Sequence, residues 1–218
     1  SDVCSSDLVH FEYRCAPEHK YPCALEDTLK VWDWLTEKGY KEENIITVGD
    51  SAGGHLSVNL MMKLKEAGRK LPRAAVLISP WLDMTASGKS YVDNYKVDPV
   101  FGIRGQTPTA EEVKELLMKS ELYMWLGDND RKNPYISPVY NTFDETYPPI
   151  LVTVGGNEML LSDSQTLVEK WNQAGSIAKI HIAEGMFHAF NIYQLFPEAQ
   201  KALKIADDFI KEQFFGNK

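Results

Sequence analysis

Short apolar runs alternate along this chain with longer segments whose apolar residues recur every three or four positions. The runs at residues 8–13, 45–48, 74–78, 150–154 and 178–182 have the length of β-strands, and the segments at 24–38, 51–67, 162–174 and 198–214 have helical spacing. Glycines follow three of the helical segments, where helices commonly end. Because such an alternation requires crossover connections, it predicts a mostly parallel sheet with helices on both faces, an α/β fold in one domain.

The alternation is interrupted between residues 84 and 146. No strand pattern is visible there, and the clearest element is an amphipathic segment at 109–125, where Thr109 and Glu112 have the spacing of a capping box. An insertion of this size over the strand ends suits a cap that covers a substrate. The alternative is a set of extra helices packed at the edge of the sheet.

Residues 1–8 differ from the rest, since they are polar and have neither helical nor strand periodicity. We expect a non-native or disordered leader at 1–8 and the α/β domain at 9–218, with 84–146 as the cap-like insertion. The alternative is a short frayed terminus, which is common in native domains.

The charge balance and the cysteines limit the function classes. The 218 residues carry a formal net charge of −8, which disfavours nucleic acid and anionic membranes as partners. No apolar run reaches the roughly 18 residues of a membrane span, and no signal peptide is visible. Cys4, Cys15 and Cys23 have neither a paired framework nor metal-site spacing. We therefore expect a cytoplasmic protein, with a homodimer as an alternative to a monomer.

A G-x-S-x-G motif at residues 49–53 lies between a predicted strand and a predicted helix, the context in which it carries a nucleophile. The glycines permit a turn tight enough to expose the hydroxyl of the central Ser51. The N-terminus of the following helix favours a developing oxyanion. We predict that Ser51 is the nucleophile and that the backbone N–H of Ala52 is an oxyanion donor. The alternative is a glycine-rich turn in which Ser51 caps the helix.

A serine nucleophile needs a general base within hydrogen-bond reach. His188 lies in a glycine-containing loop after the last predicted strand, and it leaves room for an acid between itself and Ser51, in the chain order serine, acid, histidine. Of the other histidines, His10 and His181 fall in predicted strands, His19 in a turn and His55 one helical turn after Ser51. We therefore predict His188 as the base.

Two carboxylates follow the strand at 150–154. Glu158 is placed just past the carboxyl end of that strand, where the active groups of open α/β sheets lie. Asp163 is expected in the first turn of the next helix, beside a capping box formed by Ser162 and Gln165. A glutamate can orient an imidazole and stabilise its cation. We favour Glu158 as the acid and keep Asp163 as the alternative.

These segments resemble the hormone-sensitive lipase-like carboxylesterases of the α/β-hydrolase fold, and the resemblance extends over nearly all of the chain from Leu8 onward. Residues 13–19 (YRCAPEH) and 21–27 (YPCALED) are similar to the family's YRLAPEHPFPAALED, and residues 49–54 match its GDSAGG elbow. Residues 79–83 (SPWLD) resemble SP-x-x-D, and 185–190 (GMFHAF) resemble G-M-x-H-x-F. The family's acid motif, D-P-L-x-D-E, places its first aspartate on Glu158, a departure that keeps Asp163 as an alternative.

A second departure is the oxyanion loop. The family carries an HGGG motif upstream of the YR-x-APEH segment, and this sequence contains no HGGG. The resemblance therefore implies an N-terminally truncated chain without the first strands. Since the loss of one oxyanion donor typically costs about 10²–10³ in kcat, the chain is expected to be weakly active or inactive as it stands.

The resemblance implies a serine carboxylesterase that hydrolyses short- to medium-chain esters through an acyl-enzyme, with no metal or organic cofactor. Trp81, Met186, Phe187 and Phe190 are candidate walls of the substrate pocket, although each side chain is equally suited to an ordinary core. The alternatives are a non-catalytic module that binds a small ligand in the same fold, or a peptidase. The expected partner is a small ester, with neither nucleic acid nor membrane.

Overall fold

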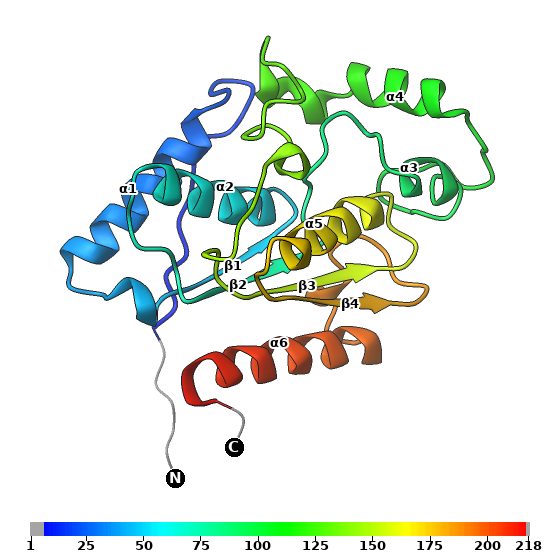
Figure 1. Cartoon of the computed structure of the whole chain (residues 1–218). Coiled ribbons are helices and arrows are strands. Elements are labelled where there is room, and N and C mark those ends of the chain that lie inside the picture. The colour runs from blue at the N-terminus through cyan, green and yellow to red at the C-terminus, as the bar shows by residue number, and fades with distance from the viewer. Residues whose placement is uncertain (1–6, 217–218) are drawn as a thin grey trace.

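A parallel four-stranded sheet forms the centre of the computed structural model, which describes residues 7–216 (Figure 1). The strands are β1 (Ile46–Asp50), β2 (Ala74–Ile78), β3 (Ile150–Gly155) and β4 (Ala178–Ala183), and their spatial order equals their order in the chain. All three neighbouring pairs are parallel. The strands predicted from residue 45 onward are therefore confirmed, with boundaries that differ by one residue or two.

Three helices cover the two faces of this sheet, and a fourth, α1 (Cys23–Glu37), packs against α2 (Ala52–Glu66). These two helices, together with α5 (Leu161–Gln173) and α6 (Pro197–Phe215), agree with the predicted helical segments. Figure 1 shows α2 and α5 on one face and α6 on the other. The larger core lies beneath α2 and α5, where Met61 and Trp171 pack against Leu77 and Val152; Phe209 of α6 closes the opposite face. The predicted α/β class is thus confirmed.

The two central strands are buried on both faces, whereas the outer ones are partly open. Every residue of β3 is buried, as expected for a strand covered by helices on both sides. In β1, by contrast, Val48 keeps 57% of its surface exposed, and in β4 Ile182 keeps 42%. The carboxyl ends of all four strands meet at one edge, which places the segments after β1, β3 and β4 near one another.

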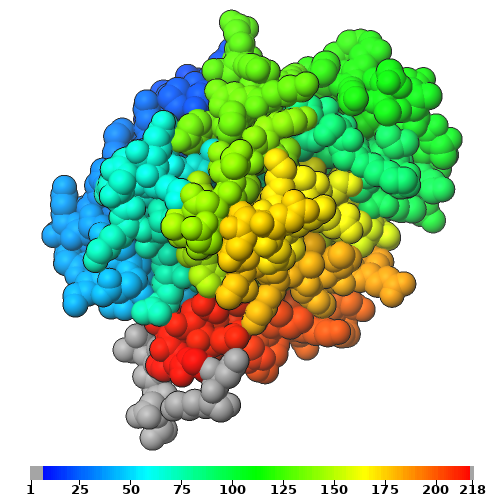
Figure 2. Space-filling model, viewed as in Figure 1, coloured from blue at the N-terminus to red at the C-terminus, as the bar shows by residue number. Residues whose placement is uncertain are grey.

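The segment 84–146 contains helices and turns but no strand. Its elements are α3 (Ser90–Asp93), α4 (Ala110–Lys119) and two short 3₁₀ helices, η2 (Glu121–Leu126) and η3 (Pro138–Tyr140). In the view of Figure 2 it forms the upper part of the molecule, in green. The capping box of Thr109 and Glu112 is confirmed.

The single helix predicted at 109–125 is wrong in length. Ser120 adopts an extended conformation with ψ of 142°, and its hydroxyl accepts a hydrogen bond from the N–H of Leu122. This side chain caps the next turn, so the α-helix ends at Lys119 and a 3₁₀ turn follows it.

Three other expectations fail or lie outside the description. Residues 8–13 form no strand, because no described strand pairs with them and an extended segment needs a hydrogen-bonded neighbour. Ser162 does not cap α5; the N-cap position is Leu160, without a side-chain cap. Of the expected leader at 1–8, residues 1–6 lie outside the described residues. Asp7 accepts a hydrogen bond from the hydroxyl of Tyr40, and Leu8 is 91% exposed.

Candidate active site

Ser51 occupies a strained turn between β1 and α2. Its backbone has φ of 51° and ψ of −111°, a region that non-glycine residues rarely adopt and that is often found at functional sites. A Cβ on Gly49 would lie 2.3 Å from the carbonyl carbon of Gly53, and one on Gly54 would lie 2.7 Å from the Cβ of Pro80. The two glycines therefore allow the close approach of backbone that the turn requires.

The backbone of Ser51 is also fixed from the neighbouring strand. Its N–H donates to the carbonyl of Ile78 at 2.8 Å, and its carbonyl accepts from the N–H groups of His55 and Trp81, each at 3.2 Å. Because α2 begins at Ala52, the positive end of the helix dipole lies beside Ser51. The turn thus presents a serine hydroxyl at the N-terminus of a 15-residue helix.

The structure brings Glu158 and His188 into contact. The carboxylate of Glu158 is fully buried after β3, and its Oε2 lies 3.1 Å from Nδ1 of His188. Its Oε1 accepts two hydrogen bonds of 2.5 Å, from the hydroxyl of Ser79 and from the N–H of Gly155. With Nδ1 donating to this carboxylate, the other ring nitrogen of His188 is left with its lone pair, as a general base requires.

A ring from the 84–146 segment holds the imidazole from another side. Phe101 lies against His188 with ring centroids 4.7 Å apart. The turn before Phe101 is organised by the buried Asp98, whose Oδ1 accepts from the N–H groups of Val100 and Phe101. Its Oδ2 accepts from the N–H of Met159 at 2.7 Å, so the same side chain also fixes the loop that carries Glu158.

Ser51 and His188 reach the same edge of the sheet from β1 and β4. Within the described chain no hydrogen bond joins the hydroxyl of Ser51 to His188, whose side chain is 9% exposed. Such a contact is commonly long in a ligand-free site and shortens when substrate binds.

Asp163 has a different environment from Glu158. It lies in the first turn of α5, 2% exposed, and its Oδ2 accepts from the N–H groups of Leu82 and Asp83 at 2.9 Å and from the hydroxyl of Tyr91. Burial, reinforced by the nearby Asp83 carboxylate, raises the pKa of Asp163 well above its ordinary value. Its partners belong to the loop after β2 and to α3, and His188 is not among them.

The remaining histidines differ in their surroundings. His55 is buried in α2, where Nε2 pairs with the carbonyl of Ile136 at 3.1 Å and burial lowers its pKa to about 4. His181 lies in β4 as predicted, and burial lowers its pKa too. His19 lies in a bend, as expected, whereas His10 is in no strand, because residues 8–13 have no strand partner.

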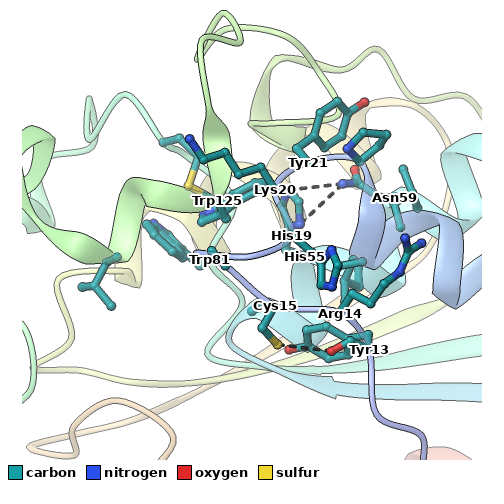
Figure 3. Close-up of a pocket in the computed structure, with 18 residues that line it drawn as sticks. Tyr13, Arg14, Cys15, His19, Lys20, Tyr21, His55, Asn59, Trp81 and Trp125 are labelled. Carbon is teal, nitrogen blue, oxygen red and sulfur yellow. Dashed lines mark hydrogen bonds between the residues drawn. The ribbon is translucent and has the colours of Figure 1, made fainter.

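A pocket of about 260 Å³ opens beside the start of α2 (Figure 3). Ala52, Trp81 and Trp125 line it, and in Figure 3 the two tryptophans lie on one side of the cavity, opposite Arg14 and Tyr13. His55 and Asn59 form part of its wall. Trp81 thus lines a pocket together with Ala52, whereas Ser51 and His188 are not among the lining residues.

Three predicted pocket residues lie elsewhere. Phe190 is fully buried against Ala199 and Ala202 of α6, and Met186 and Phe187 pack against the same cluster. None of the three lines the pocket beside α2. The loop after β4 returns its apolar side chains to the face covered by α6, an orientation that the local sequence does not indicate.

Sequence reasoning missed four residues of this region. Ser79 was visible only as part of the SP-x-x-D resemblance, and its contact with Glu158 depends on two strands meeting. Asp98, which precedes a proline, indicated only a loop. No sequence pattern pointed to Phe101. The contact of His55 with the carbonyl of Ile136 joins residues 81 positions apart, which no local pattern indicates. Each would have needed knowledge of the tertiary arrangement.

Two further observations concern the described part of the chain. Within residues 7–216, no helix is long and apolar enough to cross a membrane. In the same range, no group of three or more His, Cys, Asp or Glu side chains could hold a metal ion.

Comparisons with known proteins agree with this geometry. A family model described as the α/β-hydrolase fold matches residues 1–192. An esterase of Acinetobacter venetianus is 33% identical over 203 residues, covering 93% of this chain and 63% of the relative. Esterase LipU of Mycobacterium tuberculosis is 32% identical, covering 97% of this chain and 69% of the relative.

Among solved structures, an esterase from the bacterial hormone-sensitive lipase family is similar with a TM-score of 0.80 and 34% identity, over 93% of this chain and 64% of that one. The chain thus spans about two thirds of the length of these relatives. The chain belongs to the hormone-sensitive lipase-like carboxylesterase family of the α/β-hydrolase fold.

Proposed function

We propose that the protein is a serine carboxylesterase that works through an acyl-enzyme, with Ser51 as nucleophile, His188 as base and Glu158 as the acid that orients it. The observation that carries the proposal is the buried Glu158–His188 pair at the same sheet edge as the strained turn of Ser51. A satisfied carboxylate beside one imidazole nitrogen, with the other nitrogen left as acceptor, is the arrangement that activates a serine.

In the proposed reaction, Nε2 of His188 takes the proton of Ser51 as its Oγ attacks the ester carbonyl. The tetrahedral oxyanion is stabilised by the N–H of Ala52 and by the dipole of α2. The imidazolium, stabilised by Glu158, then protonates the leaving alcohol, and water hydrolyses the acyl-enzyme with the same base. Every proton is carried by the side chains named, so these steps require no cofactor.

The size of the pocket supports short- to medium-chain esters. Ala52 lines the pocket and its N–H is the proposed oxyanion donor, so one part of the pocket lies beside the proposed oxyanion site. A volume of about 260 Å³ lies just below the usual range of ligand pockets, which begins at roughly 300 Å³. Its walls at Trp81, Trp125 and Leu122 are apolar, in keeping with an aliphatic chain.

The same residues weigh against the alternatives. A non-catalytic binding module has no need of a strained serine or of a buried carboxylate beside a histidine. A peptidase on this fold remains the second candidate, and no specific observation favours it. For the compartment we propose the cytoplasm, supported by the free thiols of Cys15 and Cys23, which are kept reduced there. Cell fractionation tests this location.

The first test is hydrolysis of p-nitrophenyl acetate and butyrate by the purified chain, with Ser51→Ala as the comparison. We expect Ser51→Ala to lower kcat by roughly 10⁴-fold or more, the loss typical of a removed nucleophile. Turnover that is measurable in wild type and equal in Ser51→Ala would overturn the proposal. A peptide p-nitroanilide assayed in parallel distinguishes an esterase from a peptidase.

A second form of the protein tests the oxyanion site. This form carries an added N-terminal segment with an HGGG motif, which the present sequence lacks. A rise in kcat of at least about 10²-fold is expected if the segment supplies further donors beside Ala52. If the extended form is folded and neither form reacts with an ester or with a fluorophosphonate at Ser51, the assignment of the nucleophile is wrong.

A further inference from the structure

The hydroxyl of Ser79 lies between the two halves of the Glu158–His188 pair. It donates to Oε1 of Glu158 at 2.5 Å and accepts from the N–H of Ala189, next to His188, at 3.1 Å. Ser79 follows β2, whereas Glu158 and His188 follow β3 and β4. One hydroxyl therefore joins the strand ends that carry the acid and the base.

The backbone around this hydroxyl is held in an unfavourable conformation. Ser79 has φ of 45° and Ala189 has φ of 53°, and both are among the four non-glycine residues with positive φ in the described chain. A third member of that group is Ser51. Strain of this kind costs about 1–3 kcal/mol per residue and persists where the surrounding structure fixes it. The strain thus lies at the hydroxyl, the base loop and the nucleophile.

The surroundings of Ser79 favour a strong effect on the carboxylate. Ser79 is fully buried, and its own N–H is fixed by the carbonyl of Thr153 at 2.7 Å, so the side chain has little freedom to turn away. A hydrogen bond to an ionised carboxylate in a buried site is about twice as strong as a neutral one. Without the hydroxyl, Oε1 of Glu158 keeps only the N–H of Gly155 as a donor.

We propose that Ser79 is a positioning residue of the esterase: its hydroxyl fixes the Glu158 carboxylate and the backbone of the His188 loop in one geometry, and so sets the orientation and basicity of His188. The proposal rests on the proposed function, because it assigns Ser79 a role in the same reaction. Ser79 acts through Glu158 and His188 and does not itself contact the reacting atoms.

The test compares Ser79→Ala with Ser79→Gly and a matched control, Ser176→Ala. Ser176 is another buried serine with two hydrogen bonds, but its partners are the carbonyls of Asp144 and Tyr147, remote from the site. Both substitutions at Ser79 remove the hydroxyl, while only glycine relieves the strain at φ of 45°. We expect both to lower kcat by roughly 10- to 100-fold with little change in KM, although they differ in stability, and the control to keep wild-type kcat.

The pH profile of kcat/KM separates positioning from a general loss of structure. Removal of a donor makes the carboxylate more basic and the imidazolium easier to form, so the acid limb of the profile should move to higher pH in Ser79→Ala. In a Glu158→Ala background, the further substitution Ser79→Ala should lower kcat by far less than it does alone. An equal fall in both backgrounds, with an unmoved acid limb, would overturn the proposal.

Nuclear magnetic resonance of the His188 imidazole gives a readout that needs no turnover. In the folded wild-type chain we expect the tautomer with a proton on Nδ1, and in Ser79→Ala an altered titration of this ring. If neither the wild-type chain nor the form extended with HGGG reacts at Ser51 but the ring responds to Ser79→Ala, the proposed function fails while the positioning stands. If the ring titrates identically in both proteins, the positioning role is wrong, whatever the activity.

Discussion

The carboxyl edge of the sheet and the segment 84–146 are built in different ways. At the edge, regular strands fix the backbone, and Ser51, Glu158 and His188 lie in the turns and loops that follow strand ends. The segment has only short helices and turns, and buried polar side chains fix it to the main fold at both ends. Asp163 accepts hydrogen bonds from the N–H groups of Leu82 and Asp83, which immediately precede the segment.

At the other end of the segment, His55 and Asn59 of α2 bond to the carbonyls of Ile136 and Tyr135. The segment also donates hydrogen bonds to the main fold, since the side chain of Asn94 donates to the carbonyls of Gly156 and Glu158. Catalysis at the carboxyl edge of the sheet is thus expected to depend on a few side chains. The position of the segment 84–146 depends instead on buried polar contacts, and these respond to pH.

The largest expected effect is at the edge. Glu158→Gln keeps the shape of the side chain but removes the charge that stabilises the imidazolium of His188. We expect kcat for p-nitrophenyl butyrate to fall by roughly 10²–10⁴-fold with the fold intact, the range seen when a triad acid is neutralised. Steady-state kinetics beside circular dichroism measure this. A variant with wild-type kcat would remove Glu158 from the proposed triad.

A smaller effect, on stability, is expected at His55, which bonds to the segment near its C-terminal end. The pKa of His55 is about 4 in the folded chain and about 6.5 when unfolded, so the unfolded state binds the proton first. Its contribution to stability is therefore complete above pH 6.5 and is lost as pH falls toward 4, by roughly 3 kcal/mol.

Urea unfolding of wild type and His55→Gln between pH 7 and pH 4 measures this contribution. The difference in unfolding free energy between the two should shrink as the pH falls. His181, whose pKa is also lowered, is present in both proteins and cancels in the comparison. A difference that stays constant with pH would mean that His55 titrates normally.

Asp163→Asn sharpens the contrast between the two buried carboxyl groups. The amide oxygen can still accept from Leu82 and Asp83, and the side chain contacts no member of the proposed triad, so we expect kcat to change by less than roughly tenfold. Because the folded-state pKa of Asp163 is raised, wild type loses stability as pH rises through the acidic range, and the asparagine variant does not.

Thermal unfolding of both proteins at pH 5 and pH 8 tests this sign. The asparagine variant should gain stability relative to wild type at the higher pH. If instead its kcat falls as far as that of Glu158→Gln, Asp163 is the acid and the assignment of Glu158 is reversed.

The smallest effect is expected within the segment itself. Thr109→Ala removes the capping box of α4, which should cost about 1 kcal/mol and lower Tm by roughly 2–4 °C. Thr109→Ser, which keeps the hydroxyl, should retain most of the stability. Calorimetry measures the shift, and kcat should not change, because α4 contributes no residue to the site at the sheet edge. A fall in kcat would show that the segment and the edge are more closely coupled.

The sequence alone determined the four strands of the sheet, the helices that pack around it and the residues proposed to catalyse the reaction. Apolar runs such as 74–78 and helical spacing such as that of 24–38 are local patterns, which is why β2 and α1 could be predicted almost to the residue. The turn at Ser51 was equally visible, because only glycines fit its close backbone contacts. Glu158 and His188 could be named from their positions after strands.

Only the tertiary structure decided how these residues meet. Glu158 and Asp163 are five positions apart and both buried, yet one faces His188 and the other holds the loop after β2, a difference set by the direction of each side chain and not by its chemistry. The same holds for Ser79, whose hydroxyl has a partner 79 residues away in Glu158 and another 110 residues away in Ala189. Local sequence fixes backbone periodicity, but contacts across such separations form only when the strands align.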